Sequence, residues 1–241
     1  MSCLIVCLAA RLIDAAGKRG VYMTESGHRD PRVISYLTLR RAVGYLGIAL
    51  PVALAAGNTL IFSGRLQQSV SDYFYTGMRG VLVGGLCVIG AFLLAHHAED
   101  RWERLFTRAA GVGAIGVGLF PTPPPHPSLL GAVAGDLHVT FGALAFTALL
   151  ALPLWLFRRT DPGRSRPDLL RKRVYLASGI VMLLALMTAG LSSLPLAAAL
   201  GHLDPVFWAE SAAIAAFSVA WLVRGQAFLR DRQPLPAGAI R

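Results

Sequence analysis

The sequence predicts an all-α, polytopic membrane protein, a bundle of six transmembrane helices with both termini in the cytoplasm. Hydrophobic residues make up 55% of the 241 residues and charged residues only 15%, whereas soluble domains carry closer to a quarter charged residues. Apolar runs of about 20 residues recur along the chain, and this length crosses the roughly 30 Å hydrocarbon core of a bilayer. Lysine and arginine are concentrated in alternate connections, as the positive-inside rule requires of a multi-pass protein.

Residues 1–39 are predicted to form a cytoplasmic N-terminal segment. Their apolar run from Cys3 to Ala10 is too short to span a bilayer, and basic residues follow it instead of preceding it as in a signal peptide. We expect either an amphipathic helix on the membrane surface or a translation start at Met23. The chain has no CxxC pair, so its three cysteines predict neither a disulfide framework nor a metal site.

The transmembrane domain is predicted to cover residues 40–229, and residues 230–241 form a cytoplasmic tail. Six apolar segments lie within it, at about 42–62, 80–95, 105–120, 137–157, 174–194 and 206–223. The second and third segments are short for a span and borrow residues from their flanks. Pro51 in the first segment and Pro153 in the fourth predict kinks in their helices.

The charge distribution predicts the side of the membrane that each connection faces. Of the 23 lysine and arginine residues, 21 precede the first segment, lie in the second and fourth connections, or follow the sixth segment. Only Arg65 and Arg79 lie elsewhere, which places both termini in the cytoplasm. The net charge of +10 has the same explanation, so nucleic-acid binding is not expected.

Small residues at four-residue spacing predict where the helices approach one another. Lipid tails give helices no hydrophobic reason to associate, so close backbone contact matters. The spacing occurs in three segments, at Gly80 and Gly84, at Ala110, Ala114 and Gly118, and at Ala212, Ala216 and Ala220. We expect these rows to form the packing seams of the bundle.

Uncommon polar residues fall on the side opposite to the basic connections. Glu210 lies about one turn inside the sixth segment, where an ionised carboxylate costs several kcal/mol unless it finds a partner. Arg79 is the first candidate partner and His138 the second, because both are predicted at a similar depth. The candidate site is therefore a polar cluster at the outer face, made of Asp72, Tyr73, Tyr75, Arg79, His138 and Glu210.

Each charged member of this cluster also has a purely structural interpretation. Asp72 can cap the second helix through backbone amides. His138 can be a hydrogen-bonding core histidine instead of a ligand. Arg79 can extend outward to lipid phosphate, or its pairing with Glu210 can serve only to fix the register of two helices.

Four stretches resemble a known family: SVSDYFYTGMRGVLVGGLCVIGAFL, GVGLFPT, LHVTFGALAF and FWAESAAIAAFSVAWLVRGQAFL. Together they resemble the bacterial and archaeal membrane proteins grouped as domain of unknown function 998, over about residues 40–229. The positions that match are Ser71, Asp72, Tyr73, Tyr75, Arg79, Pro121, Thr122, His138 and Glu210. The resemblance implies a multi-pass protein of the bacterial plasma membrane and no particular activity. Family members often carry an acid after the arginine of the first stretch, whereas Gly80 stands here and removes one carboxylate from the cluster.

We expect a non-enzymatic membrane protein, a lipid-interacting component whose polar cluster opens to the outer face. Its expected partners are membrane lipids, its protein partners stay open, and neither a cofactor nor a metal ion is expected. The sequence contains neither a serine nucleophile elbow nor an HExxH stretch. This weighs against an enzyme, and no catalytic residue is assigned.

Two other function classes stay open. A membrane-embedded enzyme acting on a lipid or small substrate at the extracytoplasmic face could use Asp72, His138 and Glu210 as acid, base or metal ligands. A small transporter is the further alternative, although transporters usually hold their polar site at the membrane midplane. A bis-histidine haem protein is disfavoured, because only His138 is well placed.

Overall fold

The computed structural model describes residues 36–98, 100–123, 128–159, 166–191 and 203–227. Within these ranges the chain is helical and contains no β-strand, so the predicted all-α class is confirmed. The elements are α2 (Tyr36–Phe62), the 3₁₀ helix η1 (Ser71–Tyr75), α3 (Arg79–Leu94), α4 (Arg101–Leu119), α5 (Leu129–Arg159), α6 (Arg166–Leu191) and α7 (Pro205–Arg224). Each of the six predicted apolar segments overlaps one α-helix.

Some predictions concern residues outside the described ranges. The N-terminal apolar run, the translation start at Met23 and the tail at 230–241 all fall there. Of the predicted N-terminal segment, only the residues from Tyr36 onward are described, and they belong to α2.

Within the described ranges, four helices are long and apolar enough to cross a membrane. They cover Thr38–Phe62, Leu129–Arg159, Pro167–Leu191 and Pro205–Arg224. α3 is apolar but has only 16 residues, so at 1.5 Å per residue it reaches about 24 Å, less than the hydrocarbon core. α4 begins with charged residues, among them Arg101 and Glu103, which shortens its apolar part. Length and composition thus indicate a membrane protein with four clear spanning helices.

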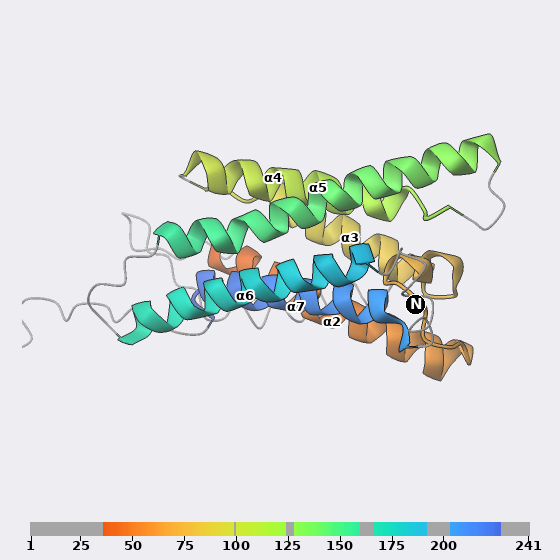
Figure 1. The fold of residues 1–241 in the computed structure, drawn as a ribbon, viewed down its shortest axis with the longest axis horizontal. Coiled ribbons are helices and arrows are strands. Elements are labelled where there is room, and N and C mark those ends of the chain that lie inside the picture. Colours follow the sequence, from red (N-terminus) through yellow and green to blue (C-terminus); the bar gives the residue numbers. More distant parts are fainter. Residues whose placement is uncertain (1–35, 99, 124–127, 160–165, 192–202, 228–241) are drawn as a thin grey trace, which may run out of the picture.

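The six α-helices of the described residues form a closed ring in which each packs against its neighbours in the sequence. α2 contacts α3, α3 contacts α4, and the series continues to α7, which packs back against α2. The helices run along a common direction, so the molecule is elongated (Figure 1). The connections from α3 to α4, from α4 to α5 and from α5 to α6 are short, which favours this order because consecutive antiparallel helices then lie side by side. η1 lies at one end of the ring and contacts α3.

Glycines of α3 and α4 allow the closest helix contacts. A Cβ atom added at Gly90 would lie 2.7 Å from the Gly111 carbonyl oxygen. A Cβ atom at Gly113 would lie 2.7 Å from the Ala145 backbone nitrogen in α5. Both distances are too short for any side chain, so these glycines are required where α4 crosses its two neighbours.

The predicted packing seams hold in α4 and are wrong in part elsewhere. Ala110 of α4 is fully buried, as predicted. In α3, a Cβ atom at Gly80 or Gly84 would meet nothing within 4 Å, so this row points away from the ring. In α7, Ala212 is exposed and its neighbour Ala213 is buried instead.

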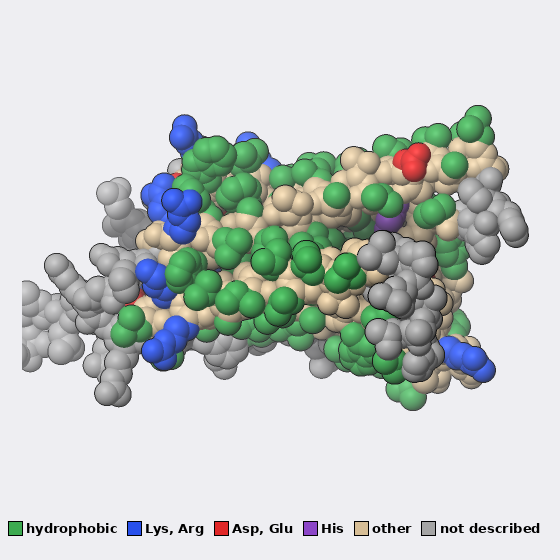
Figure 2. Space-filling view, in the orientation of Figure 1, with side chains coloured by type: hydrophobic (Ala, Val, Ile, Leu, Met, Phe, Trp, Pro, Cys, Tyr) green, Lys and Arg blue, Asp and Glu red, His purple; other side chains and the backbone are tan. Residues whose placement is uncertain are grey.

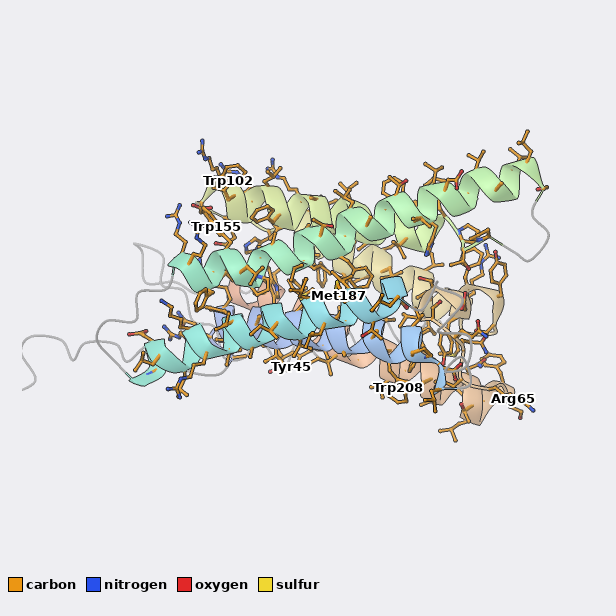
Figure 3. All side chains as sticks on the ribbon, in the orientation of Figure 1. Tyr45, Arg65, Trp102, Trp155, Met187 and Trp208 are labelled. Atoms are coloured by element: carbon orange, nitrogen blue, oxygen red, sulfur yellow. The ribbon has the colours of Figure 1, made fainter. Side chains whose placement is uncertain are left out.

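Basic side chains gather at one end of the visible face, where α4 begins and α5 ends (Figure 2). We call this the basic end and the opposite end, which holds η1, the η1 end. Arg65 lies at the η1 end, and Trp208 lies on the same half of the molecule (Figure 3). Trp102 and Trp155 lie at the basic end (Figure 3). The sequence predicts that basic residues are concentrated on one side, and the structure places them at one end of the long axis of the molecule.

Candidate functional site

The polar stretch 69–80, SVSDYFYTGMRG, folds over the η1 end and is tied to α7. Tyr73 is fully buried, and its ring centroid lies 6.0 Å from that of Phe207. The Tyr73 hydroxyl oxygen accepts a hydrogen bond from the Gln67 backbone N–H at 3.5 Å, and burial raises the pKa of this phenol. The Phe207 N–H donates to the Gln68 carbonyl oxygen at 2.8 Å. These contacts fix the stretch against the start of α7.

Glu210 lies in the second turn of α7, and its carboxylate faces this stretch. Its Oε2 atom accepts a hydrogen bond from the Val70 backbone N–H at 2.7 Å, which satisfies a donor on a buried residue. The ion pair predicted between Glu210 and Arg79 is not formed. Within the described part of the chain, no lysine or arginine pairs with this carboxylate. A loop amide holds Glu210 in place of a cation.

Arg79 stacks on an aromatic ring instead. Its guanidinium carbon lies 3.9 Å from the ring centroid of Phe74, within the range of a cation–π contact. The side chain is exposed and lines a shallow hollow between α3 and α4, with Gly80, Val83 and Gly118. This position agrees with the interpretation in which Arg79 reaches lipid phosphate, and it removes Arg79 from the surroundings of Glu210.

Asp72 and Tyr75 contact the residues that follow α4. The Asp72 carboxylate accepts a hydrogen bond from the Thr122 hydroxyl at 3.3 Å, and the Tyr75 hydroxyl donates to the Thr122 carbonyl oxygen. The predicted capping role of Asp72 is wrong, because Asp72 lies inside η1 and α3 begins only after Met78. Both side chains thus connect the η1 stretch to the α4–α5 connection.

His138 lies on α5 and reaches across to the end of α4. Its Nδ1 atom lies 2.7 Å from the Phe120 carbonyl oxygen. A carbonyl oxygen only accepts, so Nδ1 carries a proton, and Nε2 of the neutral ring is a hydrogen-bond acceptor. This contact agrees with the interpretation of His138 as a hydrogen-bonding histidine of the bundle.

His138 and Glu210 line one cleft, an opening of about 610 Å³ between α5, α6 and α7. Ser71 and Thr147 are further polar residues in its wall. The other described residues of the wall are apolar or glycine, and include Gly142, Phe146, Ala185, Leu186, Ala189 and Ala213. The cleft therefore combines a few polar groups with a larger apolar surface.

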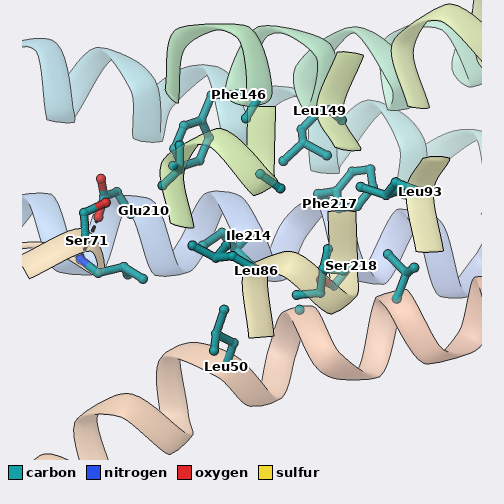
Figure 4. A pocket seen from close by; sticks show the side chains of 18 of the residues that line it. Leu50, Ser71, Leu86, Leu93, Phe146, Leu149, Glu210, Ile214, Phe217 and Ser218 are labelled. Atoms are coloured by element: carbon teal, nitrogen blue, oxygen red, sulfur yellow. Dashed lines mark hydrogen bonds between the residues drawn. The ribbon is translucent and has the colours of Figure 1, made fainter. Parts of the chain in front are cut away.

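A smaller cavity of about 80 Å³ lies inside the ring and shares Glu210 with the cleft. Glu210 and Ser71 stand at one end of it, and side chains such as Leu86, Ile214 and Phe217 form the remainder (Figure 4). The carboxylate of Glu210 is thus placed between two largely apolar spaces, where an uncompensated charge is costly.

The structure brings two of the six predicted site residues, His138 and Glu210, into one cleft. The other four lie outside its wall. Over the described ranges, no group of three His, Cys, Asp or Glu side chains could hold a metal ion. What the cleft offers chemically is a carboxylate and an imidazole acceptor beside apolar surface.

A second polar cluster, which the sequence interpretation missed, is buried at the basic end. Glu103 accepts hydrogen bonds from Arg40 at 2.8 Å and from Arg224 at 3.0 Å. Its Oε1 atom lies 3.5 Å from His96 Nε2. Glu103 is 3% exposed and His96 is 2% exposed. The cluster joins α2, α4, α7 and the turn after α3 at one point.

Charge in this cluster is carried by the glutamate and the arginines. Burial raises the pKa of Glu103, but His96 and the positive charges of Arg224 and Arg40 outweigh burial and lower this pKa to about 2. Burial lowers the pKa of His96 below its ordinary 6.5, although Glu103 opposes this. Arg40 Nη2 lies 3.0 Å from His96 Nε2, so this nitrogen faces both the guanidinium of Arg40 and the carboxylate of Glu103.

One sequence signal could have revealed this cluster. The acids Asp100 and Glu103 lie among the arginines of a basic connection, where a count of lysine and arginine overlooks them. Asp100 caps α4 by accepting hydrogen bonds from the backbone N–H groups of Trp102 and Glu103. A cap at Asp100 places Glu103 inside the first turn of α4, where it can face the ring.

Comparison with known proteins returned no relative of this chain. No protein-family model, no curated protein and no solved structure matches it. The cleft between α5, α6 and α7 is therefore interpreted from its own geometry.

Proposed function

We propose that the chain is a six-span protein of the bacterial plasma membrane, with both termini in the cytoplasm and the η1 end outside. The gathering of basic side chains at the basic end supports this orientation (Figure 2). The ring places α3 and α4 between helices that are long enough to span by themselves, which supports six spans. The resemblance to domain of unknown function 998 leads to the same proposal.

Within this arrangement the protein binds a membrane lipid and is not an enzyme. The observation that carries this proposal is the cleft between α5, α6 and α7, which is mainly apolar and holds its polar groups around His138 and Glu210. Small-molecule sites usually have this form, with an apolar wall and a few polar groups that orient the ligand. An amphiphile matches this cleft, since the alkyl chain of the ligand fits the apolar wall and the head group of the ligand can bind His138 and Glu210.

An enzyme acting at the outer face is the second candidate function. It is favoured by Ser71, which lines the cleft together with His138 and Glu210. Nucleophilic catalysis needs the hydroxyl within hydrogen-bond reach of a base that a third group orients. His138 Nδ1 is bonded to the Phe120 carbonyl instead of to a carboxylate, which weighs against this role. Labelling of Ser71 by a fluorophosphonate probe would support the enzyme.

A pair of glycine variants tests lipid binding. Gly142 lines the cleft, and a Cβ atom there would lie 3.9 Å from Val117 Cγ2, an ordinary contact. The Gly142→Phe variant is expected to fold and to fill the cleft with its ring. Gly84→Phe is the matched control, because a Cβ atom at Gly84 meets nothing within 4 Å and Gly84 does not line the cleft.

Lipid that co-purifies with each variant is quantified by mass spectrometry after exchange into a lipid-free detergent. Wild type and Gly84→Phe are expected to retain the same lipid class in the same amount. Gly142→Phe is expected to retain at least about tenfold less of this lipid, which corresponds to a loss of about 1.4 kcal/mol of binding free energy. Equal retention by all three proteins, or no enrichment of any lipid class over the host membrane, would contradict the proposal.

A further inference from the structure

Among the residues that the structure describes, Glu210 is an acid with no cationic partner. Its Oε2 atom accepts the Val70 N–H, and the carboxylate forms no other hydrogen bond or ion pair with any described residue. The two basic residues outside the basic connections, Arg65 and Arg79, are both exposed, and Arg79 is stacked on Phe74. A carboxylate in largely apolar surroundings gains most from a ligand that brings a positive charge or several hydrogen-bond donors.

His138, the second polar group of the cleft, also favours a ligand that donates hydrogen bonds. His138 Nδ1 donates to the Phe120 carbonyl, so Nε2 is left as an acceptor when the ring is neutral. An anionic head group would meet a carboxylate and an acceptor nitrogen, and the described residues of the wall include no lysine or arginine. An ammonium group has three N–H donors and no acceptor, and it therefore matches both groups.

The remainder of the wall selects for an alkyl chain. Phe146, Leu186 and Ala189 extend the cleft as apolar surface along α5 and α6, and the inner cavity next to Glu210 is also apolar (Figure 4). A small hydrophilic amine would leave this surface without a partner. Burial of an alkyl chain contributes about 0.8 kcal/mol per CH₂ group.

We propose that the cleft is a head-group-selective site for amphiphiles that carry a primary ammonium, with Glu210 as the charge partner and His138 Nε2 as a second acceptor. This inference rests on the lipid-binding function proposed above and adds the class of ligand. A carboxylate and an ammonium attract more strongly in a low-dielectric cleft than in water, so a bound ammonium would supply the counter-charge that the described residues do not.

The test uses the full chain in lipid nanodiscs and three probes with the same photoreactive alkyl chain. The probes end in a primary ammonium, a hydroxyl or a sulfate group, and labelled peptides of α5 and α6 are quantified by mass spectrometry. Wild type is expected to be labelled by the ammonium probe at least about tenfold more than by the sulfate probe. In Glu210→Gln this ratio should fall to about one, while labelling by the hydroxyl probe stays unchanged.

Asp136→Asn is the matched control, because Asp136 is an exposed acid of α5 and does not line the cleft; it should behave as wild type. Glu210→Gln keeps an oxygen that can accept the Val70 N–H, and unchanged labelling by the hydroxyl probe shows that the cleft is intact. An ammonium preference that survives Glu210→Gln, or equal labelling of wild type by all three probes, overturns the inference but leaves lipid binding standing. Absence of labelling by all three probes overturns lipid binding itself.

A competition experiment distinguishes an ammonium group carried by an amphiphile from one carried by a small, water-soluble amine. Unlabelled long-chain alkylammonium should compete with the ammonium probe, and water-soluble butylammonium at the same concentration should not. Equal competition by the two amines would mean that the ligand is a free amine, which overturns the assignment to an amphiphile.

Discussion

Glu103 binds two arginines and contacts a histidine, so its negative charge organises the basic end of the ring. Arg40 and Arg224 donate to its two carboxylate oxygens at 2.8 Å and 3.0 Å, and His96 lies 3.5 Å away. Arg40 and Glu103 are almost completely buried. Loss of one partner in such a pair leaves the other charge buried without compensation.

Replacement of Glu103 is therefore expected to destabilise the bundle strongly. Glu103→Gln keeps the size of the side chain and removes its charge, and should lower the free energy of unfolding by roughly 3–5 kcal/mol. The measurement is unfolding by SDS in mixed micelles, followed by circular dichroism.

Asp100→Asn is the matched control for this prediction. Asparagine can still cap α4, and the change removes only the ion pair with Arg159, whose side chain is 62% exposed. Surface pairs of this kind contribute little to stability, because water and salt screen their charges. If Glu103→Gln costs no more than Asp100→Asn, the role given to the buried cluster is wrong.

The same cluster predicts that the protein loses stability in acid. The pKa of His96 in the folded protein lies below its ordinary 6.5, so the unfolded chain takes up a proton first and stability falls as the pH drops below about 6.5. Glu103 has a folded pKa of about 2 against an ordinary 4.5. Its contribution is complete above about pH 4.5 and is lost as the pH falls toward 2.

Unfolding free energies measured by SDS titration between about pH 8 and pH 5 separate these two contributions, because Glu103 stays ionised throughout this range. His96→Gln should remove most of the decline seen in wild type. A decline of the same size in the variant would assign the pH dependence to another group.

The sequence predicted that Arg79 pairs with Glu210, and this prediction is wrong because the direction of a side chain cannot be derived from its depth along a helix. Depth along the helices suggested that the two side chains could meet. Arg79 instead begins α3 with its side chain on Phe74, and Glu210 bonds a backbone amide. Side-chain direction at a helix start and hydrogen bonds to loop amides leave no pattern in the sequence.

At the scale of single elements, α4 is the helix with the tightest contacts. Its glycines meet α3 at Gly90 and α5 at Ala145, at distances that exclude a Cβ atom. Four-residue spacing predicted a seam in α4 correctly, because glycine and alanine occupy most of its positions between 109 and 118. In α3 the same spacing selected the wrong row, since Gly85 and Gly90 face the ring and Gly84 does not. Spacing identifies a row of small residues but not the direction in which it faces.

A methyl group added to α4 should therefore cost more than one added to α3. Gly113→Ala places a Cβ atom 2.7 Å from the Ala145 backbone nitrogen, and overpacking of this kind costs about 1–3 kcal/mol. Gly84→Ala meets nothing and should be neutral or stabilising by up to about 1 kcal/mol, since alanine favours helix over glycine. SDS titration of both variants tests this, and equal destabilisation would show that α4 does not pack as described.

For the whole molecule, hydropathy predicted most of the architecture. Apolar runs located the six α-helices of the described residues, whereas the ring in which each packs against its neighbours in the sequence is seen only in the structure. The cleft was beyond prediction, because its wall depends on the rotation of α5, α6 and α7 relative to one another. The sequence placed Glu210 and His138 at one level, and only the fold shows that they share a cavity wall.

We propose that the η1 end, with the cleft beside it, faces the outside of the cell. Labelling of single cysteines by a membrane-impermeant maleimide in intact cells measures this orientation. In a cysteine-free background, Gln68→Cys marks the η1 end and Arg159→Cys marks the basic end, and both side chains are exposed. We expect Gln68→Cys to be labelled in intact cells and Arg159→Cys only after permeabilisation. Labelling of Arg159→Cys alone in intact cells would contradict the account.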